Sequence, residues 1–176
     1  MIELSKTFQL HRTKTSIVKS LQTVNVESSY SGQVFPEDGK INDEWVKTLI
    51  TNMKNSNFIH KKYLMMMILK VKEHYEKKET LVEINVADDD EFTVCGDVHG
   101  QFYDLINIFE INGYPSEKNP YLFNGDFIDR GSFSVEVIIT LLAWKILYPE
   151  HFHMARGNHE SKNLNKIYGY VCIRFT

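Results

Sequence analysis

Cysteine is scarce in this sequence, because Cys95 and Cys172 are the only two among 176 residues. Two cysteines build no disulfide framework, which excludes a small disulfide-stabilised secreted domain and fits a reducing compartment. Long apolar runs are also absent: the most apolar stretch, residues 135–148, contains Glu136 and Lys145 and is too short to cross a bilayer. The amino terminus lacks the apolar segment of a signal peptide. We therefore expect a cytoplasmic or nuclear protein, or one in both places, with no membrane partner.

A strong charge of either sign is missing as well. The formal net charge is −3, with 43% hydrophobic and 24% charged residues, which is ordinary for a soluble globular protein. We therefore expect no nucleic-acid partner. The acidic residues 88–90 lack the spacing of an EF-hand, so a solvated turn is the simpler interpretation. No G-x-G-x-x-G motif follows a strand, which excludes a Rossmann dinucleotide-binding domain.

The first half of the chain is predicted to be an arm followed by two helices. Residues 1–40 are polar and patchily apolar, which is typical of an extended arm or linker, with a short helix near residues 17–21. Asn42 or Asp43 can cap a helix that ends near Asn55. A second helix is predicted over residues 59–78, and a short strand over residues 81–84. The predicted apolar faces of the two helices are Trp45, Leu49 and Met53, then Leu64, Ile68, Val71 and Tyr75, with Met67 beside them.

Three short apolar runs in the second half each end in a cluster of polar residues. They span residues 92–95, 121–124 and 152–155, and their β-branched and aromatic content predicts buried strands. Helical patterns between them indicate a βαβαβ unit and a parallel sheet, so the fold class is α/β. Ligand sites in such sheets lie at the carboxyl ends of the strands. The three polar clusters are therefore predicted to meet at one edge. The helical patterns show two apolar faces: Phe102, Leu105, Ile106 and Phe109, then Val135, Ile138, Ile139, Leu142 and Ile146.

All three polar clusters contain residues suited to bind metal. Asp97 and His99 alternate by two, so both side chains face the same way on an extended segment. Asp126 follows the next strand, and Asn158 offers an amide oxygen after the third. Carboxylates with an imidazole suit a dication such as Mn, Fe or Zn, and a central carboxylate can bridge two of them. Two such metal ions would activate a water for attack at phosphorus.

The remaining polar residues suggest proton transfer and phosphate binding. His159 is placed to protonate a departing alcohol, and Asp129 could orient it. Arg130 has the planar fork that binds phosphate oxygens. Each cluster alone is commonly a turn or a loop salt bridge, but three at consecutive strand ends favour a metal site. Capping or a supporting salt bridge is the simpler interpretation for Arg156 and Glu160, and Tyr103, Asp104, Phe127 and Phe133 are assigned as structural or rim residues.

Three motifs resemble the signature of the phosphoprotein phosphatase family of metal-dependent serine/threonine phosphatases. They are Gly-Asp-Val-His-Gly (96–100), Gly-Asp-Phe-Ile-Asp-Arg-Gly (125–131) and Arg-Gly-Asn-His-Glu (156–160). The resemblance implies a metallophosphoesterase-like (calcineurin-like) sheet sandwich flanked by helices, of which this chain supplies only the amino-terminal half. The implied organisation is an arm over residues 1–40, the catalytic domain's amino-terminal part over 41–170 and a divergent tail over 171–176.

The resemblance also implies a role for each matching residue. The implied reaction is the hydrolysis of phosphoserine and phosphothreonine in proteins by a water that two Mn, Fe or Zn ions activate. Asp97 and His99 would bind the first ion, Asp126 both ions, and Asn158 the second ion. His159 with Asp129 would be catalytic, and Arg130 with Asn158 would bind the substrate phosphate.

Three functional hypotheses remain open at this point. In the family, the second metal ion also takes two histidines from the carboxyl-terminal half of the domain, so its site is expected to be incomplete here. The chain is an active phosphatase, a catalytically inactive truncated form that acts only in binding, or another metallophosphoesterase that hydrolyses nucleotides or phosphodiesters. Phosphoprotein substrates are the expected partners. One branch of the family has a tetratricopeptide-repeat domain that docks the chaperone Hsp90. No such repeat pattern is present here, so chaperone docking is not implied.

Overall fold

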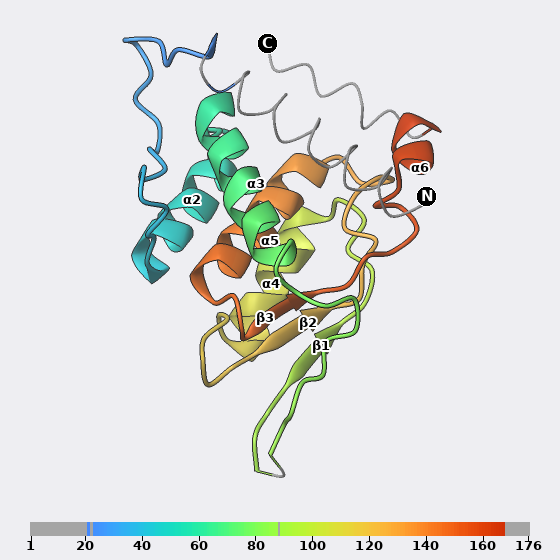
Figure 1. The fold of residues 1–176 in the computed structure, drawn as a ribbon. Helices are drawn as coiled ribbons and strands as arrows, with labels where there is room; N and C mark the ends of the chain where they lie inside the picture. The colour runs from blue at the N-terminus through green and yellow to red at the C-terminus, as the bar shows by residue number, and fades with distance from the viewer. Residues whose placement is uncertain (1–20, 22, 88, 168–176) are drawn as a thin grey trace.

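The computed structural model describes residues 21, 23–87 and 89–167 and contains a three-stranded parallel sheet (Figure 1). The strands are β1 (Thr93–Cys95), β2 (Tyr121–Phe123) and β3 (Phe152–Met154), in the order β1-β2-β3. Two crossover helices, α4 (Phe102–Asn112) and α5 (Ser134–Leu147), connect them. This arrangement confirms the predicted α/β class and the βαβαβ unit. Each strand is one residue shorter than predicted.

The two faces of the sheet are covered differently. Tyr121, Phe123 and Phe152 are fully buried against the helices, and the Phe109 ring of α4 lies 5.5 Å from Tyr121 and 6.2 Å from Phe123. The middle residues of the strands point to the other face, where Val94 is 65% exposed. Parallel sheets are normally covered on both faces. The described residues thus form one side of the predicted sandwich.

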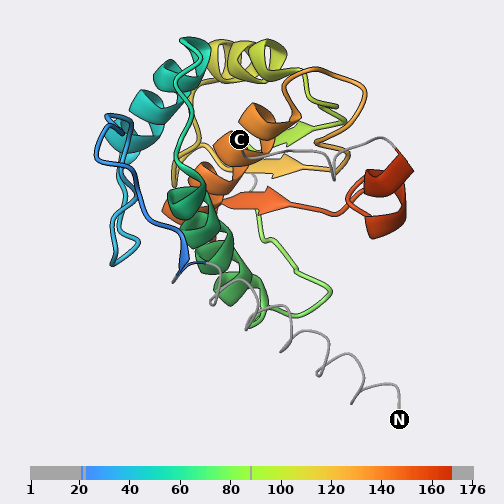
Figure 2. The same ribbon diagram turned by 90° about the horizontal axis from the view of Figure 1, so that it is seen from above.

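A second helical layer covers α5. Helix α2 (Asp43–Lys54) and helix α3 (Lys61–Tyr75) both pack on α5, away from the sheet (Figures 1 and 2). Asn42 caps α2 as predicted, because its Oδ1 accepts a hydrogen bond from the Trp45 N–H at 2.9 Å. The residues buried by the two helices are Val46, Leu49, Ile50 and Met53, then Leu64, Met67 and Val71. The predicted apolar stripe of α3 is wrong in part, since Ile68 and Tyr75 are exposed.

The predicted apolar face of α5 is also wrong in part. Of the residues predicted for it, only Ile139 is fully buried, and Ile138 and Leu142 are half-buried. Helix α5 instead buries residues around most of its circumference, because the sheet lies on one side of it and α2 and α3 lie on another. Its fully buried apolar residues are Val137, Ile139, Leu141, Ala143 and Trp144.

One local prediction fails, one helix was not predicted, and one further prediction lies mostly outside the described part of the chain. Residues 81–84 form no strand, and Leu81 is 76% exposed. Helix α6 (Lys162–Ile167) was not predicted. Of the predicted helix near residues 17–21, only residue 21 is described. Residues 24–40 form turns and extended segments. Within the described residues, no helix combines the length and apolarity needed to span a membrane.

Candidate metal and phosphate site

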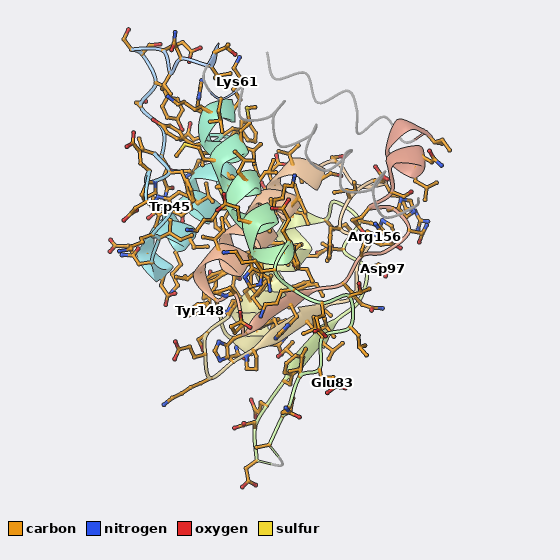
Figure 3. All side chains as sticks on the ribbon, viewed as in Figure 1. Trp45, Lys61, Glu83, Asp97, Tyr148 and Arg156 are labelled. Carbon is orange, nitrogen blue, oxygen red and sulfur yellow. The ribbon has the colours of Figure 1, made fainter. Side chains whose placement is uncertain are left out.

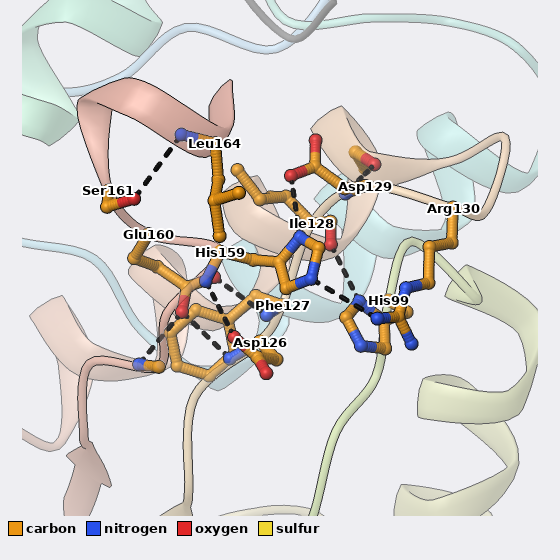
Figure 4. A network of polar contacts seen from close by, with 12 residues as sticks. His99, Asp126, Phe127, Ile128, Asp129, Arg130, His159, Glu160, Ser161 and Leu164 are labelled. Atoms are coloured by element: carbon orange, nitrogen blue, oxygen red, sulfur yellow. Dashed lines mark hydrogen bonds and ion pairs between the residues drawn. The ribbon is translucent and has the colours of Figure 1, made fainter. Parts of the chain in front are cut away.

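Side chains that follow three different strands meet at the carboxyl end of the sheet (Figure 4). His99 follows β1, Asp126 follows β2 and His159 follows β3. One ligand atom from each residue lies within 4.8 Å of the others. Asp97 and Arg156 lie at the same end of the sheet (Figure 3). The structure therefore brings together the three clusters that the sequence predicted would converge.

His99 is held in the tautomer that a metal ligand requires. Its Nδ1 lies 2.9 Å from the carbonyl oxygen of Ile128, and because a carbonyl only accepts, Nδ1 carries the proton. Its Nε2 is consequently a lone-pair donor for a metal. This atom is buried and has no hydrogen-bond partner among the described residues. Buried polar atoms rarely stay unpartnered, and a metal-binding imidazole usually donates its other N–H to a carbonyl or carboxylate, as here.

The other predicted metal ligands are Asp126, Asp97 and Asn158, and they differ in how closely they are placed to His99. Asp126 belongs to the compact group and accepts a hydrogen bond on Oδ1 from the His159 backbone N–H at 2.8 Å. The Asp97 side chain is 58% exposed, and its Oδ2 lies 3.6 Å from His99 Nε2. Asn158 is exposed on the turn next to His159. Carboxylate oxygens around an unpartnered imidazole nitrogen fit a divalent transition metal.

His159 and Asp129 form a buried pair beside this group. The two side chains are 3% and 1% exposed, and His159 Nδ1 lies 2.9 Å from Asp129 Oδ2. A carboxylate accepts, so Nδ1 donates its proton and Nε2 is left toward the centre of the site. The rings of His159 and His99 meet edge to face, with centroids 4.7 Å apart. A pair of this kind fixes the orientation of an imidazole, as proton transfer to a substrate requires.

Arg130 points at the same centre. Its Nη2 lies 3.4 Å from His159 Nε2, and because a guanidinium only donates, Nε2 is the acceptor in this contact. Arg130 itself is exposed. Its donors and the Nε2 atom of His159 thus face one point, where a phosphate group could contact both.

Backbone strain is concentrated at this site. Five non-glycine residues in the described part of the chain have positive φ angles, and four of them lie here. Each such residue costs on the order of 1–3 kcal/mol and persists only where surrounding contacts hold it. The four residues are His99 (45°), Asp126 (52°), Asp129 (68°) and Arg130 (65°).

Glu160 supplies some of the contacts that hold this strain. Its carboxylate accepts backbone hydrogen bonds from Asp126 at 2.8 Å, Phe127 at 2.8 Å and Gly157 at 3.0 Å. It thereby fixes the loop after β2 against the loop after β3. Glycine is required at position 157, because a Cβ there would clash with the Asp126 carboxylate.

Sequence reasoning did not find this role for Glu160. The sequence favoured a cap or a salt bridge, whereas the observed partners are three backbone N–H groups from two loops. Backbone donors have no side-chain signature, so no residue pattern could have indicated them. The sequence did find the pairing of His159 with Asp129, because carboxylate–imidazole pairs recur where an imidazole must be oriented.

The part of the chain that contains the site matches a known family. The calcineurin-like phosphoesterase profile matches residues 91–175. This part of the chain is similar to the calcineurin-like phosphoesterases. It is 53% identical to serine/threonine-protein phosphatase 5 of Homo sapiens over 159 residues, which are 89% of this chain and 32% of that protein. With the Arabidopsis thaliana protein of the same name, it is 53% identical over 82% of this chain and 27% of the relative.

A solved structure agrees with these relatives. A Saccharomyces cerevisiae protein serine/threonine phosphatase with similarity to human phosphatase 5 has a TM-score of 0.70 and 40% identity, covering 73% of this chain and 42% of that one. These findings confirm the resemblance to the phosphoprotein phosphatases, and the relatives named here are phosphatase 5 or are similar to it. They also confirm the metallophosphoesterase fold. The chain spans about a third of the length of the curated relatives named above.

A second match corrects one prediction. The profile described as the PPP5 TPR repeat region matches residues 4–83, which conflicts in part with the prediction that the repeat domain is absent. Residues 4–83 contain α2 and α3, which pack on α5 of the phosphoesterase part. Because of this match, the lack of a visible repeat pattern no longer argues against chaperone docking.

Proposed function

We propose that this chain contains the amino-terminal half of the catalytic domain of a protein serine/threonine phosphatase, which hydrolyses phosphoserine and phosphothreonine. The observation that carries this proposal is the buried, unpartnered Nε2 of His99 beside Asp126 and the His159–Asp129 pair. This combination offers a metal ligand and an oriented imidazole at one point. The relatives named above are protein phosphatases, which supports phosphoproteins as the substrate class.

Four residues would hold the metal ions. His99 and Asp97 would bind the first ion, Asp126 would contact both ions, and Asn158 would bind the second. A bound divalent metal supplies Lewis-acid stabilisation of the phosphoryl oxygens and a water-derived nucleophile near neutral pH. Manganese suits this donor set and is the ion that we propose to test first.

The chain's own residues would bind the phosphate and supply the proton. Arg130, with its contact to His159 exchanged for one to phosphate, would donate to the phosphoryl oxygens, and the Asn158 amide would add a further contact. As the bond between phosphorus and the serine oxygen breaks, His159 would give a proton from Nε2 to that oxygen. Asp129 would hold the imidazole in place through Nδ1 and stabilise its protonated form.

The test compares the full 176-residue chain with its Asp126→Asn variant. Manganese binding is followed by electron paramagnetic resonance, and hydrolysis is measured on a phosphoserine peptide, ATP and a phosphodiester. We expect manganese binding that is weakened by Asp126→Asn, and turnover of the phosphopeptide in preference to the other substrates. Preferred turnover of ATP or the phosphodiester would instead indicate another phosphoesterase. Manganese binding without any turnover would indicate that this chain only binds and is not catalytic by itself.

A further inference from the structure

Two aromatic side chains with no role in the site described above lie exposed beside it. Tyr103 is 53% exposed and Phe133 is 37% exposed, although most phenylalanines among the described residues are buried. Their ring centroids are 5.3 Å apart and the rings are nearly perpendicular, at 87°. An edge-to-face pair is a favourable aromatic arrangement, so the two rings form one small apolar surface. We call this pair the aromatic rim.

The backbone and a buried neighbour hold the aromatic rim in place. Tyr103 lies in the first turn of α4 and packs against the buried ring of Phe102, with centroids 5.5 Å apart. Phe133 precedes α5, and its backbone N–H donates to the carbonyl oxygen of Gly100 at 3.0 Å. Rings that are already fixed lose little conformational entropy when they bind a partner.

The aromatic rim adjoins the residues proposed to bind metal and phosphate. Phe133 lies three residues after Arg130, and Tyr103 lies four residues after His99. The two loops touch, because a Cβ on Gly100 would lie 2.8 Å from the carbonyl oxygen of Gly131. A polypeptide spans at most about 3.3–3.6 Å per residue. Residues within a few positions of a bound phosphoserine would therefore reach the rim.

We propose that Tyr103 and Phe133 bind an apolar side chain that flanks the phosphorylated residue of a substrate. This inference rests on the proposed function and adds a preference for local sequence to it. Arg130 provides charge for the phosphate, while the adjoining rim provides apolar surface. Burial of an aliphatic side chain against the surface of two fixed rings contributes affinity that a polar side chain of similar size does not.

The test uses peptides that carry a non-hydrolysable phosphonate analogue of phosphoserine, so that binding is measured without turnover. One peptide has leucine on both sides of the analogue, and a second has asparagine, which is similar in size but polar. A third has leucine on both sides of an unmodified serine. Affinities are measured by fluorescence anisotropy on the full chain with manganese, and inorganic phosphate is used as a competitor.

We expect the full chain to prefer the leucine peptide to the asparagine peptide. Tyr103→Ala and Phe133→Ala should each weaken binding of the leucine peptide by about three- to tenfold and change binding of the asparagine peptide less than twofold. Competition by inorganic phosphate should stay unchanged. Phe58→Ala is the matched control, because Phe58 is 51% exposed but lies in the loop before α3, and it should change nothing.

The proposal is overturned if the chain binds both phosphonate peptides equally, or if the rim variants weaken both to the same degree. Arg130→Ala separates this inference from the proposed function. If Arg130→Ala leaves phosphate competition intact while Tyr103→Ala and Phe133→Ala still weaken binding of the unmodified leucine peptide, the rim stands and the proposed phosphate site fails. If Arg130→Ala abolishes phosphate competition and the chain shows no leucine preference, the proposed phosphate site stands and the rim proposal fails. If no probe binds, both proposals fail.

Discussion

The loops at the strand ends and the helical layer around α5 are built in opposite ways. The loops contain four residues with positive φ, together with buried polar groups such as the His159–Asp129 pair. Helices α2, α3 and α5 contain no positive φ angle among their residues and bury mainly apolar side chains. The loops thus store strain, and the helical layer supplies the stability that offsets it. Substitutions in the loops should therefore reduce function more than stability, and substitutions in the helical layer should do the reverse.

The largest expected effect on function comes from His159→Asn. If the proposed phosphatase activity is present, the rate of phosphopeptide hydrolysis should fall by roughly 10²–10⁴-fold, the usual contribution of general acid–base catalysis. The amide N–H of asparagine can still donate toward Asp129, so the thermal unfolding temperature should change little. An unchanged rate would contradict the role given to His159, and a large loss of stability would contradict the comparison between the two regions.

The largest expected effect on stability comes from Trp144→Ala in α5. Trp144 is fully buried and contacts the rings of Phe109, Tyr114 and Tyr148, so its loss leaves a large cavity. The free energy of unfolding should fall by about 3–5 kcal/mol. Urea unfolding followed by circular dichroism measures this change. The control is Ile111→Ala, which removes a side chain that is 72% exposed and should change stability by less than about 0.5 kcal/mol.

Glu160→Gln tests whether the contacts between the loops position the metal ligands. The glutamine amide has one acceptor oxygen in place of two, so at least one of the backbone N–H groups of Asp126, Phe127 and Gly157 loses its partner. Manganese affinity should fall by about 10–100-fold, as for other residues that support metal ligands. The matched control is Glu110→Gln, because Glu110 pairs with Lys54 at the surface, 3.2 Å away. An unchanged manganese affinity in Glu160→Gln would show that its carboxylate is not needed to position Asp126.

The smallest expected effect is a pH dependence of stability that arises in the helical layer. Burial lowers the pKa of Lys145 to about 8. Its Nζ donates to the carbonyl oxygens of Pro149 at 2.7 Å and Phe152 at 2.8 Å, and a neutral amine retains two N–H groups for these bonds. Above pH 8 the folded state releases this proton while the unfolded state keeps it. The free energy of unfolding should therefore rise with pH, by about 1 kcal/mol between pH 8 and 9.

Urea unfolding at several pH values measures this rise, and Lys145→Met should abolish it. The rise in the free energy of unfolding should end near pH 9, because burial raises the pKa of the Cys95 thiol and this group then opposes the effect of Lys145. For a group whose folded pKa is raised, stability is lost as the pH rises beyond the unfolded value. If the free energy of unfolding of the unsubstituted chain does not rise between pH 8 and 9, Lys145 does not lose its proton in the folded state in this range.

The sequence alone determined the strands, the crossover helices and the edge at which the polar clusters meet. Short apolar runs that end in polar residues indicate buried parallel strands, because the spacing and composition of apolar residues depend on whether a segment is buried. The sequence also indicated the pairing of His159 with Asp129. It was less successful for α5, because periodicity assumes one buried face and α5 is covered on more than one side. It was wrong about residues 81–84, whose apolar pattern forms no strand in the described structure.

Only the tertiary structure decided the details that give the site its chemistry. The Nε2 of His99 is available for a metal because Nδ1 donates to Ile128, and that carbonyl comes from a loop 29 residues away. Glu160 acquires its role from backbone N–H groups on two loops, and Tyr103 meets Phe133 only because the loops after β1 and β2 touch. These contacts depend on backbone direction and close approach between distant segments. The identities of neighbouring residues do not contain that information.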